Sequence, residues 1–139
     1  MNKNFLNGYI PAIVWASFIL ILTSIPTLSA PSLGIDFEDK LYHFIVYFVF
    51  GLLLARAGMQ RQNSRMTVGL FYAFLMGTTF GVLDELHQTF IPGRTCDFWD
   101  ATADAIGILA GVLVFKLTST FFFQKEKLLQ DIFNKNMPE

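Results

Sequence analysis

Four apolar segments, separated by short polar stretches, follow one another along the chain. They cover about residues 9–28, 41–55, 67–90 and 97–123. A helix needs roughly 20 apolar residues to cross the hydrocarbon core of a bilayer. The second segment is short for this, so its helix is expected to begin near Asp36 with a polar first turn. The pattern predicts an all-α, polytopic membrane bundle of about four transmembrane helices.

The first segment has one competing interpretation, as a signal peptide. Lys3 precedes it, and residues 28–30 loosely resemble a cleavage site. Its uncharged run is too long for a signal peptide, and Pro31 follows the apparent cleavage point. We therefore expect a retained helix. Pro92 and Gly93 predict a turn between the last two segments.

The whole chain, residues 1–139, fits a single domain. Residues 124–139 are expected to form an exposed or interfacial helical tail on the cytoplasmic side. Hydrophobic residues make up 53% of the chain and charged residues only 15%, which leaves too little polar surface for an ordinary soluble domain. The net charge of -1 argues against a nucleic-acid partner. Membrane lipids are the expected surroundings, and oligomers are compatible with the sequence.

The basic residues predict the orientation, because cytoplasmic loops collect Lys and Arg. One side of the expected bundle receives Lys3, Arg56, Arg61, Arg65, Lys116, Lys125, Lys127 and Lys135, and the other only Lys40 and Arg94. Both termini of this multi-pass protein should therefore be cytoplasmic. Most acidic residues fall on the outer side, so any chemistry should face outward.

Polar and ionisable residues gather at the outer ends of the second, third and fourth segments. Such groups are costly at membrane depth and persist mostly where they are paired or line a cavity. The candidate cluster comprises Asp39, Lys40, His43, Glu85, Gln88, Arg94, Asp100 and Asp104. We expect Glu85, Asp100 and Asp104 to converge with His43 and Arg94 in one outward-facing pocket.

Small residues at helical spacing accompany these acids. Gly77 and Gly81 lead to Glu85 in steps of four, and Gly107 and Gly111 follow Asp100 and Asp104 by seven. Small residues at such spacing allow transmembrane backbones to approach closely. The third and fourth segments are therefore expected to pack together through these glycines.

Several of these residues also have purely structural interpretations. Asp97 suits the N-cap of the fourth helix. Glu85 lies near the end of the third helix, where the helix dipole disfavours negative charge, so Arg94 could answer it as a structural clamp or could bind a ligand. Cys96 is the only cysteine and cannot form an internal disulfide. No cofactor is expected, and the sequence does not assign metal ligands or catalytic residues.

The run of residues 85–100 (ELHQTFIPGRTCDFWD), with Asp104, Gly107 and Gly111 after it, resembles the signature of the VanZ-like family, named for a teicoplanin-resistance protein. Residues 39–44 (DKLYHF) resemble the upstream motif of the family, and together the motifs cover about residues 36–115. Family members usually have Asn at the position of Asp104. The resemblance implies a multi-helix envelope protein of the bacterial cytoplasmic (inner) membrane with a link to glycopeptide susceptibility, but it implies no reaction.

Three functions remain open from the sequence. The first is a non-catalytic protein that binds an anionic lipid or cell-wall precursor through Arg94, Lys40 and His43. The second is a lipid-phosphate hydrolase or transferase that uses a divalent metal held by the acids and His43. The third is a proton-coupled transporter. Whether the protein is an enzyme is left open.

Overall fold

The computed structural model describes residues 3–26, 34, 37–59 and 66–136. These residues form four helices and no strand: α1 (Lys3–Thr23), α2 (Glu38–Met59), α3 (Met66–Gln88) and α4 (Phe98–Asn136). The predicted all-α bundle of four helices is confirmed. Three of the helices, α2, α3 and α4, are long and apolar enough to cross a membrane, whereas the apolar part of α1, Gly8–Thr23, is shorter.

The helix bounds differ from the predicted ones at three places. Helix α1 ends at Thr23, before the predicted residue 28, because Pro26 follows closely and disfavours helical backbone before it. Helix α2 begins at Glu38, and Asp36 lies outside the described residues. Helix α4 runs on through the predicted tail as one helix of 39 residues, since no Gly or Pro interrupts it after Gly111.

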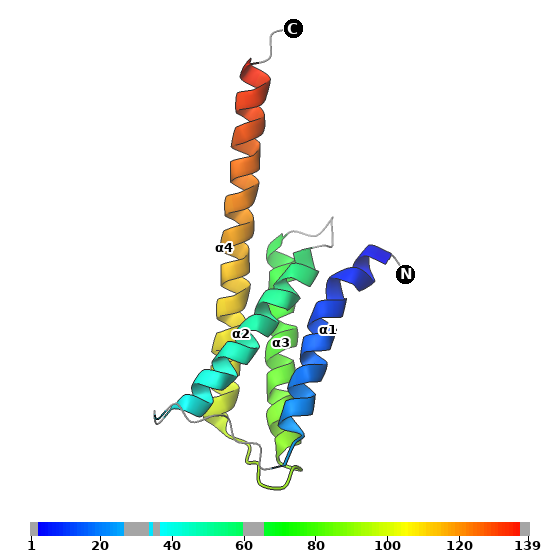
Figure 1. Ribbon diagram of the computed structural model, residues 1–139, viewed down its shortest axis with the longest axis vertical. Coiled ribbons are helices and arrows are strands. Elements are labelled where there is room, and N and C mark those ends of the chain that lie inside the picture. The colour runs from blue at the N-terminus through cyan, green and yellow to red at the C-terminus, as the bar shows by residue number, and fades with distance from the viewer. Residues whose placement is uncertain (1–2, 27–33, 35–36, 60–65, 137–139) are drawn as a thin grey trace.

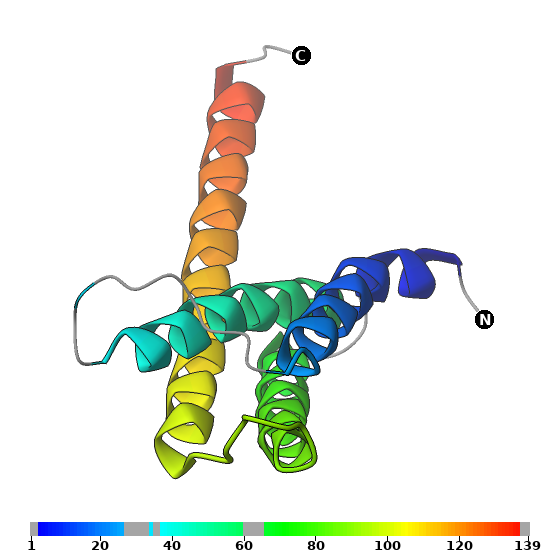
Figure 2. The same ribbon diagram turned by 60° about the horizontal axis from the view of Figure 1, so that its bottom comes forward.

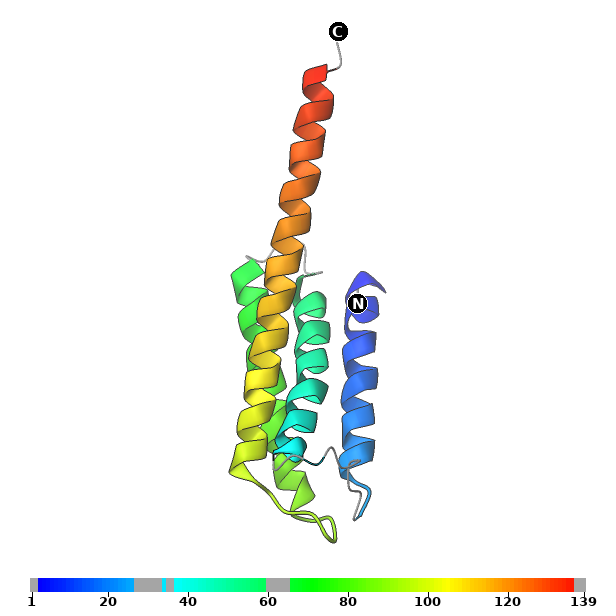
Figure 3. The same cartoon turned by 60° about the vertical axis from the view of Figure 1, so that its left-hand side comes forward.

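The helices run alternately up and down, so both chain ends lie at the same end of the bundle (Figure 1). The segment that links α3 to α4 lies at the opposite end (Figures 1 and 2). Helix α4 continues well beyond the other three helices. Figure 3 shows α1 at one side of α2, with α4 at the other. Helix α2 is central, because it packs on all three other helices and most extensively on α4, whereas α3 contacts α1 only slightly.

Glycines set the closest helix contacts, but not between the pair of helices that we expected. A Cβ added to Gly107 would lie 2.5 Å from the carbonyl oxygen of Phe44, and one added to Gly111 would overlap that of Phe48. Both glycines of α4 therefore pack on α2, and the prediction that they pack on α3 is wrong. Gly51 of α2 faces the backbone of Ile108 across the same contact.

The glycines of α3 face inward between α2 and α4. Added Cβ atoms would lie 3.0 Å from side-chain carbons of Ile108 at Gly77, and 3.2 Å from Cβ of Asp104 and from the Tyr47 ring at Gly81. Gly81 thus allows α3 to approach the acidic part of α4. The spacing predicted a small-residue face on each helix correctly, but it could not predict which neighbouring helix each face would meet.

The exposed and buried residues have the polarity expected inside a membrane. Large apolar side chains such as Val14, Phe71 and Leu117 are more than half exposed, whereas Asp84 and Asp104 are almost completely buried. A soluble protein would show the reverse arrangement. The outer surface of this bundle therefore suits contact with lipid. The buried acidic groups require an explanation, because such groups are costly inside a membrane.

Candidate functional site

Three helices each contribute one ionisable side chain to a buried group, here called the inner cluster: His43 of α2, Glu85 of α3 and Asp104 of α4. Nδ1 of His43 lies 2.9 Å from Oδ1 of Asp104 and 3.8 Å from Oε1 of Glu85. The side chains of Glu85 and Asp104 are 2% and 1% exposed, and that of His43 is 15% exposed. Of the five residues predicted to converge, these three lie together, whereas Asp100 pairs with Lys40 and Arg94 contacts Leu22 instead.

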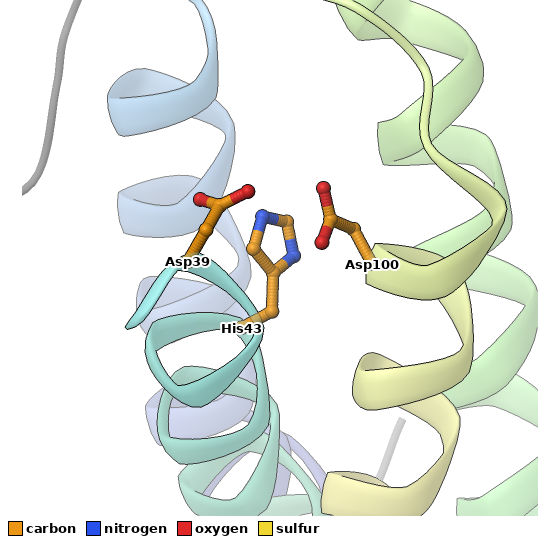
Figure 4. Close-up of side chains that lie close together, drawn as sticks. All are labelled: Asp39, His43 and Asp100. Carbon is orange, nitrogen blue, oxygen red and sulfur yellow. The ribbon is translucent and has the colours of Figure 1, made fainter. Parts of the chain in front are cut away.

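A second group lies nearer the end of the bundle and is here called the rim: Asp39, Lys40, Asp97 and Asp100. Nζ of Lys40 lies 2.9 Å from Oδ2 of Asp97 and 3.4 Å from Oδ2 of Asp39. It also lies 2.8 Å from Oδ1 of Asp100, in an ion pair that lacks hydrogen-bond alignment. Figure 4 shows the carboxylates of Asp39 and Asp100 on either side of the His43 ring. His43 therefore belongs to the inner cluster and also borders the rim.

Asp97 ties the rim to the start of α4. Its Oδ1 accepts a hydrogen bond of 2.8 Å from the backbone N–H of Trp99, which is N-cap geometry. Its own N–H donates to Oε2 of Glu85 at 3.1 Å. The hydrogen bond from Lys40, followed by that from Trp99, lowers the pKa of Asp97 below its ordinary value. The predicted capping position is observed, and Asp97 also links Lys40 to Glu85.

Glu85 is hydrogen-bonded by groups other than the predicted arginine. Besides the N–H of Asp97, it accepts a hydrogen bond of 3.1 Å from Nε2 of Gln88. Arg94 instead donates through Nη2 to the carbonyl oxygen of Leu22, at 3.4 Å. No ion pair joins Glu85 to Arg94 in the described part of the chain, so the predicted clamp is wrong. Arg94 binds the C-terminal end of α1, where the helix dipole favours a cation.

One buried arrangement, around Asp84, was not expected from the sequence. Oδ1 of Asp84 accepts a hydrogen bond of 2.7 Å from the hydroxyl of Thr23, and Oδ2 accepts one of 3.0 Å from the hydroxyl of Tyr47. This carboxyl group is thus satisfied by two hydroxyls and needs no cation beside it. Tyr47, which lies four residues after His43 on the same helix face, was the only signal in the sequence.

The remaining singled-out residues lie apart from this chemistry. Cys96 is an exposed thiol in the segment between α3 and α4. Gly77, Gly81, Gly107 and Gly111 shape the helix contacts and offer no polar side chain. The functional candidates therefore reduce to the inner cluster and the rim, with Gln88 in support of Glu85.

Carboxylates outnumber cationic side chains at this end of the bundle. Lys40 forms ion pairs with Asp97 and Asp100, and His43 lies within ion-pair distance of both Asp104 and Glu85. Among the residues that the structure describes, two sets of three side chains bring their ligand atoms within 4.8 Å of one another: the inner cluster, and Asp39 with His43 and Asp100. An arrangement of this composition suits a positively charged ligand, or a ligand that arrives with a cation.

The fold and this site together define an integral membrane protein with a buried cluster of acids and imidazole at one end of its helical bundle. The chain belongs to the VanZ/LLP1 family, whose sequence model matches residues 8–122. The family predicted from the motifs is thereby confirmed. A relative is the uncharacterized protein C11E3.10 of Schizosaccharomyces pombe, which is 28% identical over 117 residues, 82% of this chain and 69% of that protein. No solved structure matches the chain.

Proposed function

We propose that this protein binds the phosphate-bearing head group of a lipid or cell-wall precursor at the rim of its bundle. The observation that carries the proposal is the convergence of charged groups from three helices at one end, with Lys40 35% exposed among them. Ionisable residues in membrane-spanning segments pair with one another or line cavities, and they mark binding sites and ion pathways. The rim lies toward the end of the bundle, where a membrane lipid would present its polar head.

The exposed half of the rim is the part that can exchange partners. Lys40 and Asp97 each expose about a third of their side chains, and such exposed pairs contribute little to stability. A phosphate oxygen could therefore replace Asp97 on the ammonium group at small cost. Asp100, only 8% exposed, would remain as the buried partner of Lys40.

The distribution of basic residues supports an outward-facing rim. Both chain ends lie at the end of the bundle opposite the rim, together with the predicted excess of Lys and Arg (Figure 1). In a bacterial cytoplasmic membrane this orientation presents the rim to the outer leaflet, where cell-wall precursors are used. Binding there would alter glycopeptide targets and change teicoplanin susceptibility, as the family resemblance implies.

A second candidate function is hydrolysis or transfer of a lipid phosphate with the help of a divalent metal. The two sets of three potential ligands favour it, because a carboxylate-bound metal can activate water and stabilise a phosphate. Release of inorganic phosphate or of a dephosphorylated lipid from a defined phospholipid separates this candidate from simple binding.

Lipid binding by the purified protein in nanodiscs tests the proposal. The probe is dioleoyl phosphatidic acid, compared with phosphatidylcholine, for the wild type, Lys40→Gln and the matched control Lys125→Gln on the exposed distal part of α4. We expect preferential retention of phosphatidic acid by the wild type and by the control, and a loss of about tenfold in affinity for Lys40→Gln. Equal retention of both lipids by the wild type would contradict the proposal.

A further inference from the structure

We propose that the inner cluster, His43, Glu85 and Asp104, binds a divalent cation of the Mn²⁺ or Zn²⁺ class. The inference deepens the proposed function and rests on it for the lipid phosphate, but not for the cation itself. The cation would supply the positive charge that the surplus carboxylates require, and the phosphate of the lipid would bind to it.

The separation of the donor atoms suits one shared ion. Two ligands at right angles, each about 2.1 Å from a metal, lie about 3 Å apart. Nδ1 of His43 is 2.9 Å from Oδ1 of Asp104 and 3.8 Å from Oε1 of Glu85. The three donors come from three helices that the bundle already holds together, so small side-chain shifts suffice to place an ion between them.

An unsatisfied buried atom provides a second, independent observation. Oδ2 of Asp104 is buried and has no hydrogen-bond partner among the described residues, although Oδ1 of the same carboxyl group contacts His43. A buried carboxylate oxygen without a partner costs free energy and calls for an ion or a water molecule. The unsatisfied oxygen faces Gly81 of α3, four residues before Glu85 on the same helix.

Gly81 is the reason that α3 can approach this carboxyl group. A Cβ at that position would lie 3.3 Å from Oδ2 of Asp104 and 3.2 Å from the Tyr47 ring. A glycine there keeps the third helix close enough for Glu85, four residues further on, to reach the same site. The small residue that shapes the helix contact therefore also shapes the proposed ion site.

Charge balance distinguishes the inner cluster from the second set of possible ligands, which shares His43. In that set Asp100 is already paired with Lys40 at 2.8 Å, and Asp39 is 60% exposed. No Lys or Arg side chain pairs with Glu85 or Asp104 in the described ranges. Glu85 and Asp104 thus share His43 as their one cationic partner among the described residues, and the remaining negative charge of this buried cluster favours a cation there.

The donor types indicate which cations fit. One imidazole nitrogen and two carboxylate oxygens suit Mn²⁺ or Zn²⁺ better than Mg²⁺ or Ca²⁺, which prefer oxygen ligands alone. Binding would replace the proton that His43 and Asp104 share, and that proton would leave to solvent. Three protein ligands leave further coordination positions for water or for a phosphate oxygen.

Titration of the purified, chelator-treated protein with Mn²⁺, followed by electron paramagnetic resonance, tests the inference. We expect one bound ion per chain, and a loss of at least about tenfold in affinity for His43→Gln and for Asp104→Asn. The control Glu126→Gln on the exposed part of α4 should bind as the wild type does. No binding by the wild type, or a loss with Asp39→Asn but not with Asp104→Asn, would overturn the assignment.

A measurement on the wild type alone covers the case in which a variant does not fold. Pulsed electron paramagnetic resonance of bound Mn²⁺ should show coupling to one directly coordinated imidazole nitrogen, and its absence would refute the site. Retention of phosphatidic acid with and without chelator separates the two proposals. Retention without Mn²⁺ binding overturns only the cation site, whereas Mn²⁺ binding without any lipid retention overturns only the proposed function.

Discussion

His43 of α2 and Asp104 of α4 are joined across the bundle by a contact of 2.9 Å, and the second oxygen of Asp104 has no hydrogen-bond partner. The pair lies at the end of a helix contact so close that Gly107, one turn further along α4, meets the backbone of Phe44. The same helix contact thus both stabilises the bundle and holds the charged side chains in position.

Removal of His43 should destabilise the protein, because it leaves Asp104 buried without a cationic partner. We expect His43→Leu to reduce the free energy of unfolding by about 3 kcal/mol. The double substitution of His43→Leu with Asp104→Leu should recover at least half of that loss, since it removes both charges. Unfolding of the detergent-solubilised protein measures both effects, and a double variant as unstable as the sum of the single variants would contradict the pairing.

The glycine contact between α2 and α4 predicts a sharp difference between glycine positions. Gly107→Ala should reduce stability by about 2 kcal/mol or more, because its Cβ would meet the rigid backbone of Phe44. Gly77→Ala is the matched control, since its nearest neighbours are side-chain carbons of Ile108 and Leu54 rather than backbone atoms. Melting temperatures in one detergent compare the two, and equal shifts would argue against the close backbone contact.

Arg94 should act on α1 rather than on Glu85. Arg94→Ala removes the hydrogen bond to the carbonyl oxygen of Leu22, so the amides of the last turn of α1 should exchange hydrogen faster. Arg94→Lys keeps a cation near the same helix end and should exchange at an intermediate rate. Hydrogen-exchange mass spectrometry gives the answer. Unchanged exchange in α1, with faster exchange at the end of α3, would contradict this prediction and would support a Glu85–Arg94 ion pair instead.

Asp97 predicts how stability responds to acid. Its pKa in the folded protein is lowered from the ordinary value of 3.8, so its stabilising contribution is complete above that value and is lost as the pH falls below it. Asp97→Asn keeps an N-cap group but loses the ion pair with Lys40. The wild type should therefore melt above this variant near pH 6, and the difference should shrink as the pH falls below 3.8. A difference that does not change with pH would exclude the ion pair as its source.

The single cysteine makes the orientation directly testable. Cys96 is exposed in the segment between α3 and α4 and should react with a membrane-impermeant maleimide in intact cells. The matched comparison combines Cys96→Ser with Glu126→Cys, which moves the thiol to the distal part of α4 and should react only after the membrane is opened. The opposite labelling pattern would place both termini outside.

The sequence predicted the helices and the family well, because apolar segment lengths and a spaced polar motif are local signals. The proximity of His43, Glu85 and Asp104 was also predictable from the sequence, since these residues lie at corresponding ends of successive helices. The contact of Arg94 and the hydroxyl groups that bind Asp84 could not be predicted from the sequence, because those contacts depend on where α1 packs. Thr23 and Asp84 lie 61 residues apart, and no local pattern connects them.

Teicoplanin susceptibility of a sensitive bacterial host that expresses the wild type or Glu85→Gln, with membrane protein levels quantified, tests most directly whether the buried cluster is a working site. Glutamine keeps the shape of this side chain but removes its charge. We predict reduced susceptibility with the wild type alone, at equal protein levels. An equal reduction of susceptibility by both proteins would contradict the account, and so would the absence of any reduction by either protein.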